Sequence, residues 1–416
     1  MTRRRVLLTA ALVTAAAASA LAFAAYRAVG TFPVVLPVTA LDSGPGGLVA
    51  AERIGAYPRL ALQTLLDRAG LPDPVTVANG ATVYRLRYRT TNHDGAPVVA
   101  SGLVALPDNR APRSAVAYFH GTNAQRNSAP SQKTSQEGLL ATALVSGAGH
   151  LLLAPDYIGL GESHDLHPYL HTKTTVETCV DFLKAAHGLL GALGTPWPES
   201  LYLMGFSQGG HATLAVQRAL EKLEDPRFRV AASTPVAGPF NLRDISFPQA
   251  LTGQTDSHVY YLAYLASAYA AVYKQPIDSL LAKPYAETVP VLFDGDHESD
   301  IISAALPENP RELFVPEFLA AYENGTAHWF LDALAENSIR DWTPKAPVKI
   351  YFGENDVDVL PEEARSAERE LRARGADVTA VSVGPWEHNT SVLRAVPLAL
   401  TWFATLEGNE AQADAK

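Results

Sequence analysis

The chain has 416 residues, of which 47% are hydrophobic and 18% are charged, and its formal net charge is −10. This hydrophobic fraction excludes a largely disordered chain, and the length suits one large domain or one domain with a long insertion. The only basic cluster lies at the extreme N-terminus, so the sequence lacks the positive surface that nucleic-acid binding requires, and we expect no nucleic-acid partner. A single cysteine, Cys179, excludes an internal disulfide and any metal site built from several cysteines.

The first thirty residues have the pattern of an export segment. Three arginines at positions 3 to 5 precede an uncharged run, rich in alanine and leucine, over residues 6–25. We expect residues 1–30 to be an export signal whose opening resembles a twin-arginine signal, and the protein to be secreted or held in the cell envelope. The apolar run is about as long as a bilayer-spanning helix, so a retained anchor that associates with the membrane through residues 6–25 is the alternative to a cleaved signal.

Two antiparallel strands are expected after a turn-rich region. Residues 31–80 contain many turn residues and one helical stretch at residues 60–69. From residue 83 to residue 89, apolar and basic side chains alternate, which is typical of a half-buried strand. A turn over residues 92–95 then leads to an apolar stretch at residues 98–106, so the two strands are expected to pair as antiparallel neighbours.

The middle and end of the chain alternate between buried strands and helices. Continuous apolar runs, typical of strands covered on both faces, lie at residues 115–119, 151–154 and 201–204. Further strands are expected at residues 228–236, 348–352 and 378–383. Helical patterns occupy residues 176–190, 208–223, 362–374 and 391–406. This alternation predicts an α/β fold with a mostly parallel central sheet flanked by helices.

One long interval interrupts the alternation. Between residues 241 and 343 the patterns are helical or loop-like, without a convincing parallel strand, whereas ordinary connections take about 2 to 6 residues. We expect residues 243–343 to form a helical cap, inserted before the strand at residues 348–352. The core then consists of residues 31–242 and 344–408, and residues 409–416 are expected to be a disordered tail.

The most informative motif is Gly205-Phe206-Ser207-Gln208-Gly209, which lies between an apolar strand and a helix. A serine on such a strand-to-helix turn, with glycines that leave room for the crowded backbone, is typical of a nucleophile. The alternatives are a plain glycine-rich turn and a phosphate-binding loop, but the glycine spacing and the position in the chain do not fit a dinucleotide-binding fingerprint. We therefore predict that Ser207 is the catalytic nucleophile.

A serine nucleophile needs a general base and a third group that orients the base. His388, in the loop after residues 378–383, is the only histidine that follows position 356, and it is therefore the candidate base. The acid lies in the loop after residues 348–352, where we predict Asp356 and keep Asp358 as the alternative. Both loops follow the carboxyl ends of predicted parallel strands, where α/β proteins bind their ligands.

Acyl transfer also needs hydrogen-bond donors for the developing oxyanion. The backbone N–H of Gln208, directly after the serine, is the first candidate. The second is the N–H of Thr122, because the sequence His120-Gly121-Thr122 follows the strand at residues 115–119 and Gly121 permits close approach.

These motifs resemble the α/β-hydrolase superfamily and, within it, the secretory lipase family of capped triacylglycerol lipases and esterases. The matching segments cover most of residues 80–405 and are 118–122, 154–161, 205–210, 353–361 and 386–389. The resemblance implies an α/β-hydrolase fold, a helical cap at residues 243–343 and a triad of Ser207, Asp356 and His388. The chain departs from the family in lacking paired cysteines and in the late position of Pro361 in the acid loop, which keeps Asp358 open.

The sequence thus predicts a serine ester hydrolase, a lipase or carboxylesterase that works through an acyl-enzyme on a small ester or lipid. This reaction implies no cofactor. The sequence also predicts no metal site, because His164, His167 and His171 do not share a helix face. An exported peptidase of the aminopeptidase type is the alternative, with Glu298 or Glu317 holding the substrate amine, and a catalytically silent binding protein of the same fold is a lesser one.

The expected cap contains a tyrosine-rich helix. Tyr264 follows Tyr260 by four residues and Tyr261 by three, so the three side chains lie on one side of this helix. They either line an acyl tunnel or pack the cap on the sheet. The sequence predicts neither the acyl-chain preference nor the oligomeric state.

Overall fold

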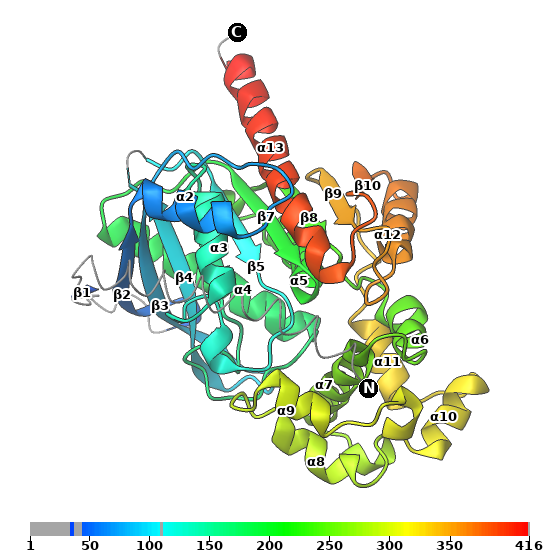
Figure 1. Cartoon of the computed structure of the whole chain (residues 1–416). Coiled ribbons are helices and arrows are strands. Elements are labelled where there is room, and N and C mark those ends of the chain that lie inside the picture. The colour runs from blue at the N-terminus through cyan, green and yellow to red at the C-terminus, as the bar shows by residue number, and fades with distance from the viewer. Residues whose placement is uncertain (1–33, 37–43, 109–110, 415–416) are drawn as a thin grey trace.

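A computed structural model describes residues 34–36, 44–108 and 111–414. The predicted export segment, residues 1–30, lies outside the described residues. Within them, the centre of the molecule is a ten-stranded sheet with the strand order β1-β2-β3-β4-β6-β5-β7-β8-β9-β10 (Figure 1).

The sheet has an antiparallel part and a parallel part. The antiparallel strands come first in the chain and are β1 (Val34–Leu36), β2 (Leu48–Tyr57), β3 (Ala81–Thr91) and β4 (Pro97–Pro107). The parallel strands are β5 (Ala115–Phe119), β6 (Leu151–Pro155), β7 (Leu201–Phe206), β8 (Val230–Val236), β9 (Val348–Phe352) and β10 (Val378–Ser382). β4 joins the two parts by pairing antiparallel with β6. The prediction of a mostly parallel central sheet is confirmed.

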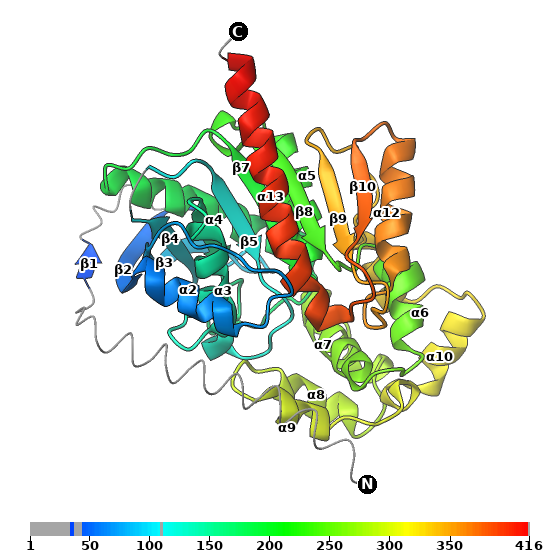
Figure 2. The same cartoon turned by 45° about the horizontal axis from the view of Figure 1, so that its top comes forward.

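Helices cover both faces of the sheet. One face carries α2 (Arg59–Arg68), α3 (Gln136–Ala141) and α13 (His388–Asp414), which lie in front of the strands in Figure 2. The other face carries α4 (Thr172–Ala192), α5 (Gln208–Leu223) and α12 (Pro361–Ala373).

Strand β7 shows why a continuous apolar strand needs helices on both sides. Its side chains alternate between the two faces, as in any strand. Leu201 and Leu203 pack into the cluster that contains α4 and α5, whereas Tyr202 and Met204 pack into the cluster that contains α2 and α13. All four side chains are buried.

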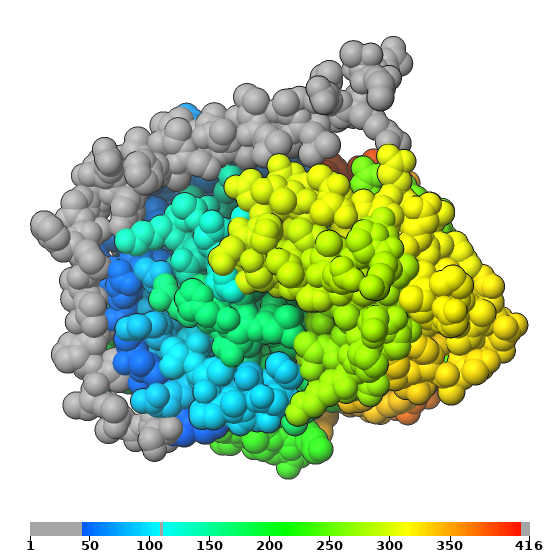
Figure 3. All heavy atoms as spheres, turned by 90° about the horizontal axis from the view of Figure 1, so that it is seen from below, coloured from blue at the N-terminus to red at the C-terminus, as the bar shows by residue number. Residues whose placement is uncertain are grey.

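Helices fill the interval in which the sequence predicts a cap. Between β8 and β9 lie α6 (Phe247–Ala250), α7 (Asp256–Val272), α8 (Tyr285–Leu292), α9 (Ser299–Ala304), α10 (Pro316–Glu323) and α11 (Trp329–Glu336). They share an aromatic core of their own around α7, and from below they form one continuous body beside the sheet domain (Figure 3). That these helices act as a cap stays a prediction, and we call them the helical insertion.

The structure differs from the sequence prediction at both ends of the core. Strand β2 lies in a region where the sequence predicts turns and one helix. The sequence does not reveal this strand, because its alanines and Gly55 hide the alternation of a half-buried strand and its register with β3 shifts twice. Helix α13 continues to Asp414, so residues 409–414 are helical where a disordered tail was expected. Their sequence, rich in alanine, glutamate and glutamine, has no helix breaker. No helix among the described residues is long and apolar enough to cross a bilayer.

Candidate active site

Ser207 occupies the sharp turn between β7 and α5. Its backbone has φ 55° and ψ −116°, a left-handed conformation that is uncommon for any residue except glycine. The turn is crowded: a Cβ atom on Gly205 would lie 2.2 Å from the carbonyl oxygen of Gly209, and one on Gly209 would lie 1.8 Å from the carbonyl oxygen of Phe119 in β5. Both glycines are therefore required where the strand, the turn and the neighbouring strand approach closely.

The structure brings Ser207, His388 and Asp356 together in one hydrogen-bonded chain. Nε2 of His388 lies 2.9 Å from Oγ of Ser207, and Nδ1 lies 2.7 Å from Oδ2 of Asp356. The carboxylate accepts the Nδ1–H, which leaves Nε2 free to accept the serine proton. All three residues are buried, and the imidazole packs on the ring of Phe206 with 4.8 Å between the ring centroids.

The geometry distinguishes the two candidate acids. Oδ1 of Asp356 accepts the backbone N–H groups of Asp358 (3.0 Å) and Val359 (2.8 Å), which directs Oδ2 at His388. The carboxylate of Asp358 instead accepts the hydroxyl of Thr255 and lies 3.8 Å from Nε2 of His258, both in the helical insertion. Asp356 therefore contacts the imidazole, and Asp358 joins the acid loop to the insertion.

The two predicted oxyanion donors flank the serine. Gln208 is the first residue of α5, so its N–H is one of the groups that a helix leaves unpaired at its N-terminus. Thr122 lines the same pocket as Ser207. In the described part of the chain, neither N–H has a hydrogen-bond acceptor. Both groups are therefore available to a substrate oxygen. Their role as an oxyanion hole stays a prediction.

A buried histidine fixes the side chain of Gln208. The Nδ1–H of His167 donates to the carbonyl of Ile158 (2.7 Å), so its Nε2 accepts from the amide of Gln208 (2.8 Å). Burial lowers the pKa of His167 to about 4, which keeps the ring neutral near pH 7. His167 thus works as a structural support, and in the described residues no group of three or more His, Cys, Asp or Glu side chains is arranged to hold a metal.

Glu137 is a site residue that the sequence analysis missed. It lies in the first turn of α3 and lines the pocket beside Ser207. Its Oε1 accepts the backbone N–H of Gly121 (3.2 Å) and the hydroxyl of Tyr118 (2.7 Å). The carboxylate therefore holds the loop that carries Thr122. No motif in the sequence links position 137 to position 121, since only the packing of α3 against β5 brings them together.

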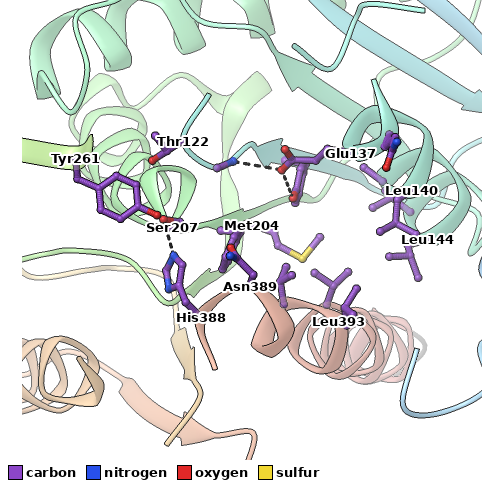
Figure 4. A pocket seen from close by; sticks show the side chains of 18 residues that line it. Thr122, Glu137, Leu140, Leu144, Met204, Ser207, Tyr261, His388, Asn389 and Leu393 are labelled. Carbon is purple, nitrogen blue, oxygen red and sulfur yellow. Dashed lines mark hydrogen bonds between the residues drawn. The ribbon is translucent and has the colours of Figure 1, made fainter. Parts of the chain in front are cut away.

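An apolar cavity of about 340 Å³ adjoins Ser207 and His388 (Figure 4). Its walls come mainly from α3, from the π-helical turn Thr142–Ser146 that follows it, and from the start of α13. The volume lies at the lower end of the range for small-molecule sites, about 300 to 1,000 Å³. The pocket therefore suits a slender apolar group next to the serine hydroxyl.

The tyrosine-rich helix α7 has divided roles. Tyr261 lines the pocket, whereas Tyr260 and Tyr264 do not. The ring of Tyr264 stacks on Tyr169, with 4.5 Å between centroids, and its hydroxyl donates to the carbonyl of Asn123 (3.1 Å). Tyr264 therefore packs the insertion on the core, which is one of the two alternatives left open by the sequence.

The acidic residues considered for a peptidase lie elsewhere. Glu298 and Glu317 are both exposed, and neither lines the pocket at Ser207. The structure does not bring them to the serine, so it offers no support for a role in holding a substrate amine there.

Several solved structures resemble this chain in overall fold. No family model and no curated protein sequence matches the chain. Among solved structures, a Legionella pneumophila protein, provisionally described as a hydrolase, is 29% identical, with a TM-score of 0.82 over 86% of this chain and 98% of its own. The rice cell wall degrading esterase LipA from Xanthomonas oryzae is 25% identical, with a TM-score of 0.74 over 89% of this chain and 98% of its own.

Candida antarctica lipase A shares the fold at 16% identity, with a TM-score of 0.60 over 83% of this chain and 78% of its own. The Legionella protein and LipA, described as a hydrolase and an esterase, support ester hydrolysis at a general level, whereas the Candida lipase shows the shared fold. The chain therefore has the α/β-hydrolase fold, and it resembles hydrolases and esterases that share this fold.

Proposed function

We propose that the protein is a serine ester hydrolase, a carboxylesterase or lipase that works through an acyl-enzyme. The observation that carries this proposal is the hydrogen-bonded chain from Ser207 through His388 to Asp356, beside an apolar pocket. A serine hydroxyl becomes a useful nucleophile only when such a base removes its proton. An apolar pocket beside it suits the hydrocarbon part of an ester.

In the first half of the reaction, Oγ of Ser207 attacks the ester carbonyl carbon while Nε2 of His388 takes the hydroxyl proton. The carbonyl oxygen becomes an oxyanion, which accepts hydrogen bonds from the N–H groups of Thr122 and Gln208. When the intermediate collapses, the C–O bond to the alcohol breaks, and His388 gives its proton to the departing alcohol.

In the second half, His388 removes a proton from water, and the resulting hydroxide attacks the acyl-serine ester. Collapse of this second intermediate releases the carboxylic acid and returns the proton to Ser207. Throughout, Asp356 holds the imidazole with its proton on Nδ1 and stabilises the imidazolium that forms. The protein supplies every acid, base and donor in this sequence.

The test compares the parent protein with Ser207→Ala on p-nitrophenyl esters and on an aminoacyl p-nitroanilide. We expect ester hydrolysis by the parent, a fall of at least about 10³ in kcat for the variant, and little nitroanilide cleavage. A phosphonate inhibitor that labels serine should add its mass to the parent and not to the variant.

A variant within tenfold of the parent would contradict the assignment, and faster nitroanilide cleavage would favour a peptidase. Absence of both activities and of labelling would favour a silent binding protein.

We also propose that the protein is exported, on the evidence of the three arginines and the apolar run at residues 6–25. Fractionation of cells that express the full chain, with mass spectrometry of the mature N-terminus, tests this. Recovery of the intact chain in the cytosol would contradict it.

A further inference from the structure

Two helical segments of the core form the long walls of the pocket beside Ser207. The residues that line it from residue 136 to residue 145 recur with the spacing of one helix face, and so do the lining residues from residue 388 to residue 396. The two faces run alongside each other for more than two turns, with Met204 of β7 between them (Figure 4). We infer that this core slot binds the acyl chain of a medium-length, straight-chain ester, and that the core sets the acyl-length preference. The inference rests on the proposed ester hydrolysis and specifies its substrate class.

The catalytic residues and the leucines of the slot lie at opposite ends. Ser207, Thr122 and His388 lie at one end in Figure 4, whereas Leu140 and Leu144 lie at the other. On the two helical walls, the lining residues after Glu137 and after Asn389 are all aliphatic, and Gln136 is the one other polar side chain of the α3 wall. A hydrocarbon chain is the occupant that this lining favours.

The helical insertion contributes little to the slot. Tyr261 is the one insertion residue in its lining, and it lies at the Ser207 end in Figure 4. The other aromatic side chains of α7, Tyr260 and Tyr264 among them, are buried in the cluster that the insertion helices share with Tyr169 and Leu170 of the core. Changes in the insertion are therefore expected to alter access to the serine, whereas changes in the core walls alter the length of chain that fits.

The slot suits the acyl group better than the alcohol. The acyl group stays covalently attached to Ser207 through both halves of the reaction, whereas the alcohol must leave before water can attack. The deep walls of the slot are the buried residues Leu144, Val145 and Val396. Buried apolar walls of this kind hold a hydrocarbon group in place, which suits the group that remains attached.

The length of the slot gives an estimate of its capacity. The eight steps from His388 to Val396 advance about 12 Å along α13, comparable to an extended chain of about ten carbons. Each methylene buried against aliphatic side chains is expected to raise kcat/KM roughly fourfold. This gain should end when the slot is full, so that kcat/KM rises from acetate to about decanoate and does not rise further for palmitate.

The experiment measures kcat/KM for p-nitrophenyl esters from acetate to palmitate in the parent and in Leu140→Trp. Leu140 is half-buried and lies toward the end of the slot away from Ser207 (Figure 4), so an indole ring there shortens the slot. We expect the ratio of decanoate to acetate kcat/KM to fall at least about tenfold. The control is Leu398→Trp, because Leu398 lies on α13, the helix of the opposite wall, but is exposed and outside the slot. Its length profile should match that of the parent.

A second variant changes the slot in the opposite direction. Leu144→Ala enlarges the far end and should shift the optimum toward longer acids, which keeps the inference testable if Leu140→Trp does not fold. Alkyl acetates of increasing alcohol length test the competing occupant. The acyl slot is wrong if the substitutions change how kcat/KM depends on alcohol length and not on acyl length, or if both variants change kcat/KM equally for all esters. Either result leaves the proposed ester hydrolysis intact. If the parent cleaves no ester faster than Ser207→Ala, the proposed function itself fails.

Discussion

Asp358 donates its backbone N–H to the carboxylate of Asp356 and turns its own carboxylate away from the site. Two acids only two residues apart thus have different partners: one contacts His388, and the other contacts the insertion. We expect Asp356→Asn to lower kcat by about 10⁴, because an amide no longer holds the proton on Nδ1. Asp358→Asn keeps the backbone N–H and should lower kcat less than about tenfold. Steady-state kinetics on one ester decide between them, and a greater loss in Asp358→Asn would reverse the assignment.

Glu137 is expected to act as a positioning residue for the loop that carries Thr122. Glu137→Leu removes the acceptor for the N–H of Gly121, so the adjacent Thr122 loses its fixed orientation, and kcat should fall about tenfold or more while KM changes less. Glu137→Gln retains an acceptor oxygen and should recover most of this loss. Tyr118→Phe removes only the second hydrogen bond to the carboxylate and is the milder control. If Gln and Leu variants are equally impaired, the negative charge and not the hydrogen bond is what matters.

Tyr264 is expected to contribute to stability and not to acyl selection. Tyr264→Leu loses the stacking on Tyr169 and Phe293, and it should lower the unfolding free energy by about 2 to 4 kcal/mol, as other large core truncations do. Tyr264→Phe keeps both rings in contact and loses only the hydrogen bond to Asn123, at a cost of about 1 kcal/mol. Denaturant unfolding measures both. The loss of kcat/KM should be equal for acetate and decanoate, and a loss that grows with acyl length would place this tyrosine in the substrate path.

Glu363 is expected to make stability depend on pH. The side chain is fully buried in α12, and this burial raises its pKa from 4.5 to about 7, although it accepts N–H groups from Phe240 and Asn241. Because the folded state holds the proton more tightly than the unfolded state, stability falls as the pH rises from about 4.5 through about 7. The difference in pKa corresponds to about 3 kcal/mol.

Glu363→Gln removes this titration while keeping an acceptor oxygen and a donor for Ser246. Relative to the parent, the variant should gain stability between pH 5 and pH 8 by up to about 3 kcal/mol. Glu362→Gln, at the exposed neighbouring position, should follow the pH dependence of the parent. Parallel curves for the parent and Glu363→Gln would show that this carboxyl does not control the effect.

The features predicted well from the sequence depend on local patterns. The buried strands show as continuous apolar runs, and the strand-to-helix serine motif shows directly at Ser207. The assignment of His388 as the base follows from its being the only histidine after Asp356. These residues lie at the carboxyl ends of strands, where the topology of a parallel sheet brings distant loops together.

The features that the sequence did not predict depend on packing between distant segments. The choice between Asp356 and Asp358 is made by which backbone N–H groups each carboxylate meets. The pocket lies between residues near 140 and residues near 393, and no local pattern links these two helix faces. The spacing of Tyr261 and Tyr264 places them on neighbouring positions of α7, but only the surrounding rings decide which one reaches the pocket.

The contacts of helix α12 and its preceding loop bear on any exchange of the insertion for that of a related hydrolase. The insertion departs beside Glu363, which accepts from Asn241, and returns beside Glu370, which pairs with Arg340. A transplanted segment without matching partners would leave the buried carboxyl of Glu363 with fewer hydrogen bonds and Glu370 without the guanidinium of Arg340. The exchanged segment therefore has to include residues 240–246 and 338–340 together with their partners on α12. A segment cut where the insertion helices begin and end would lack these contacts.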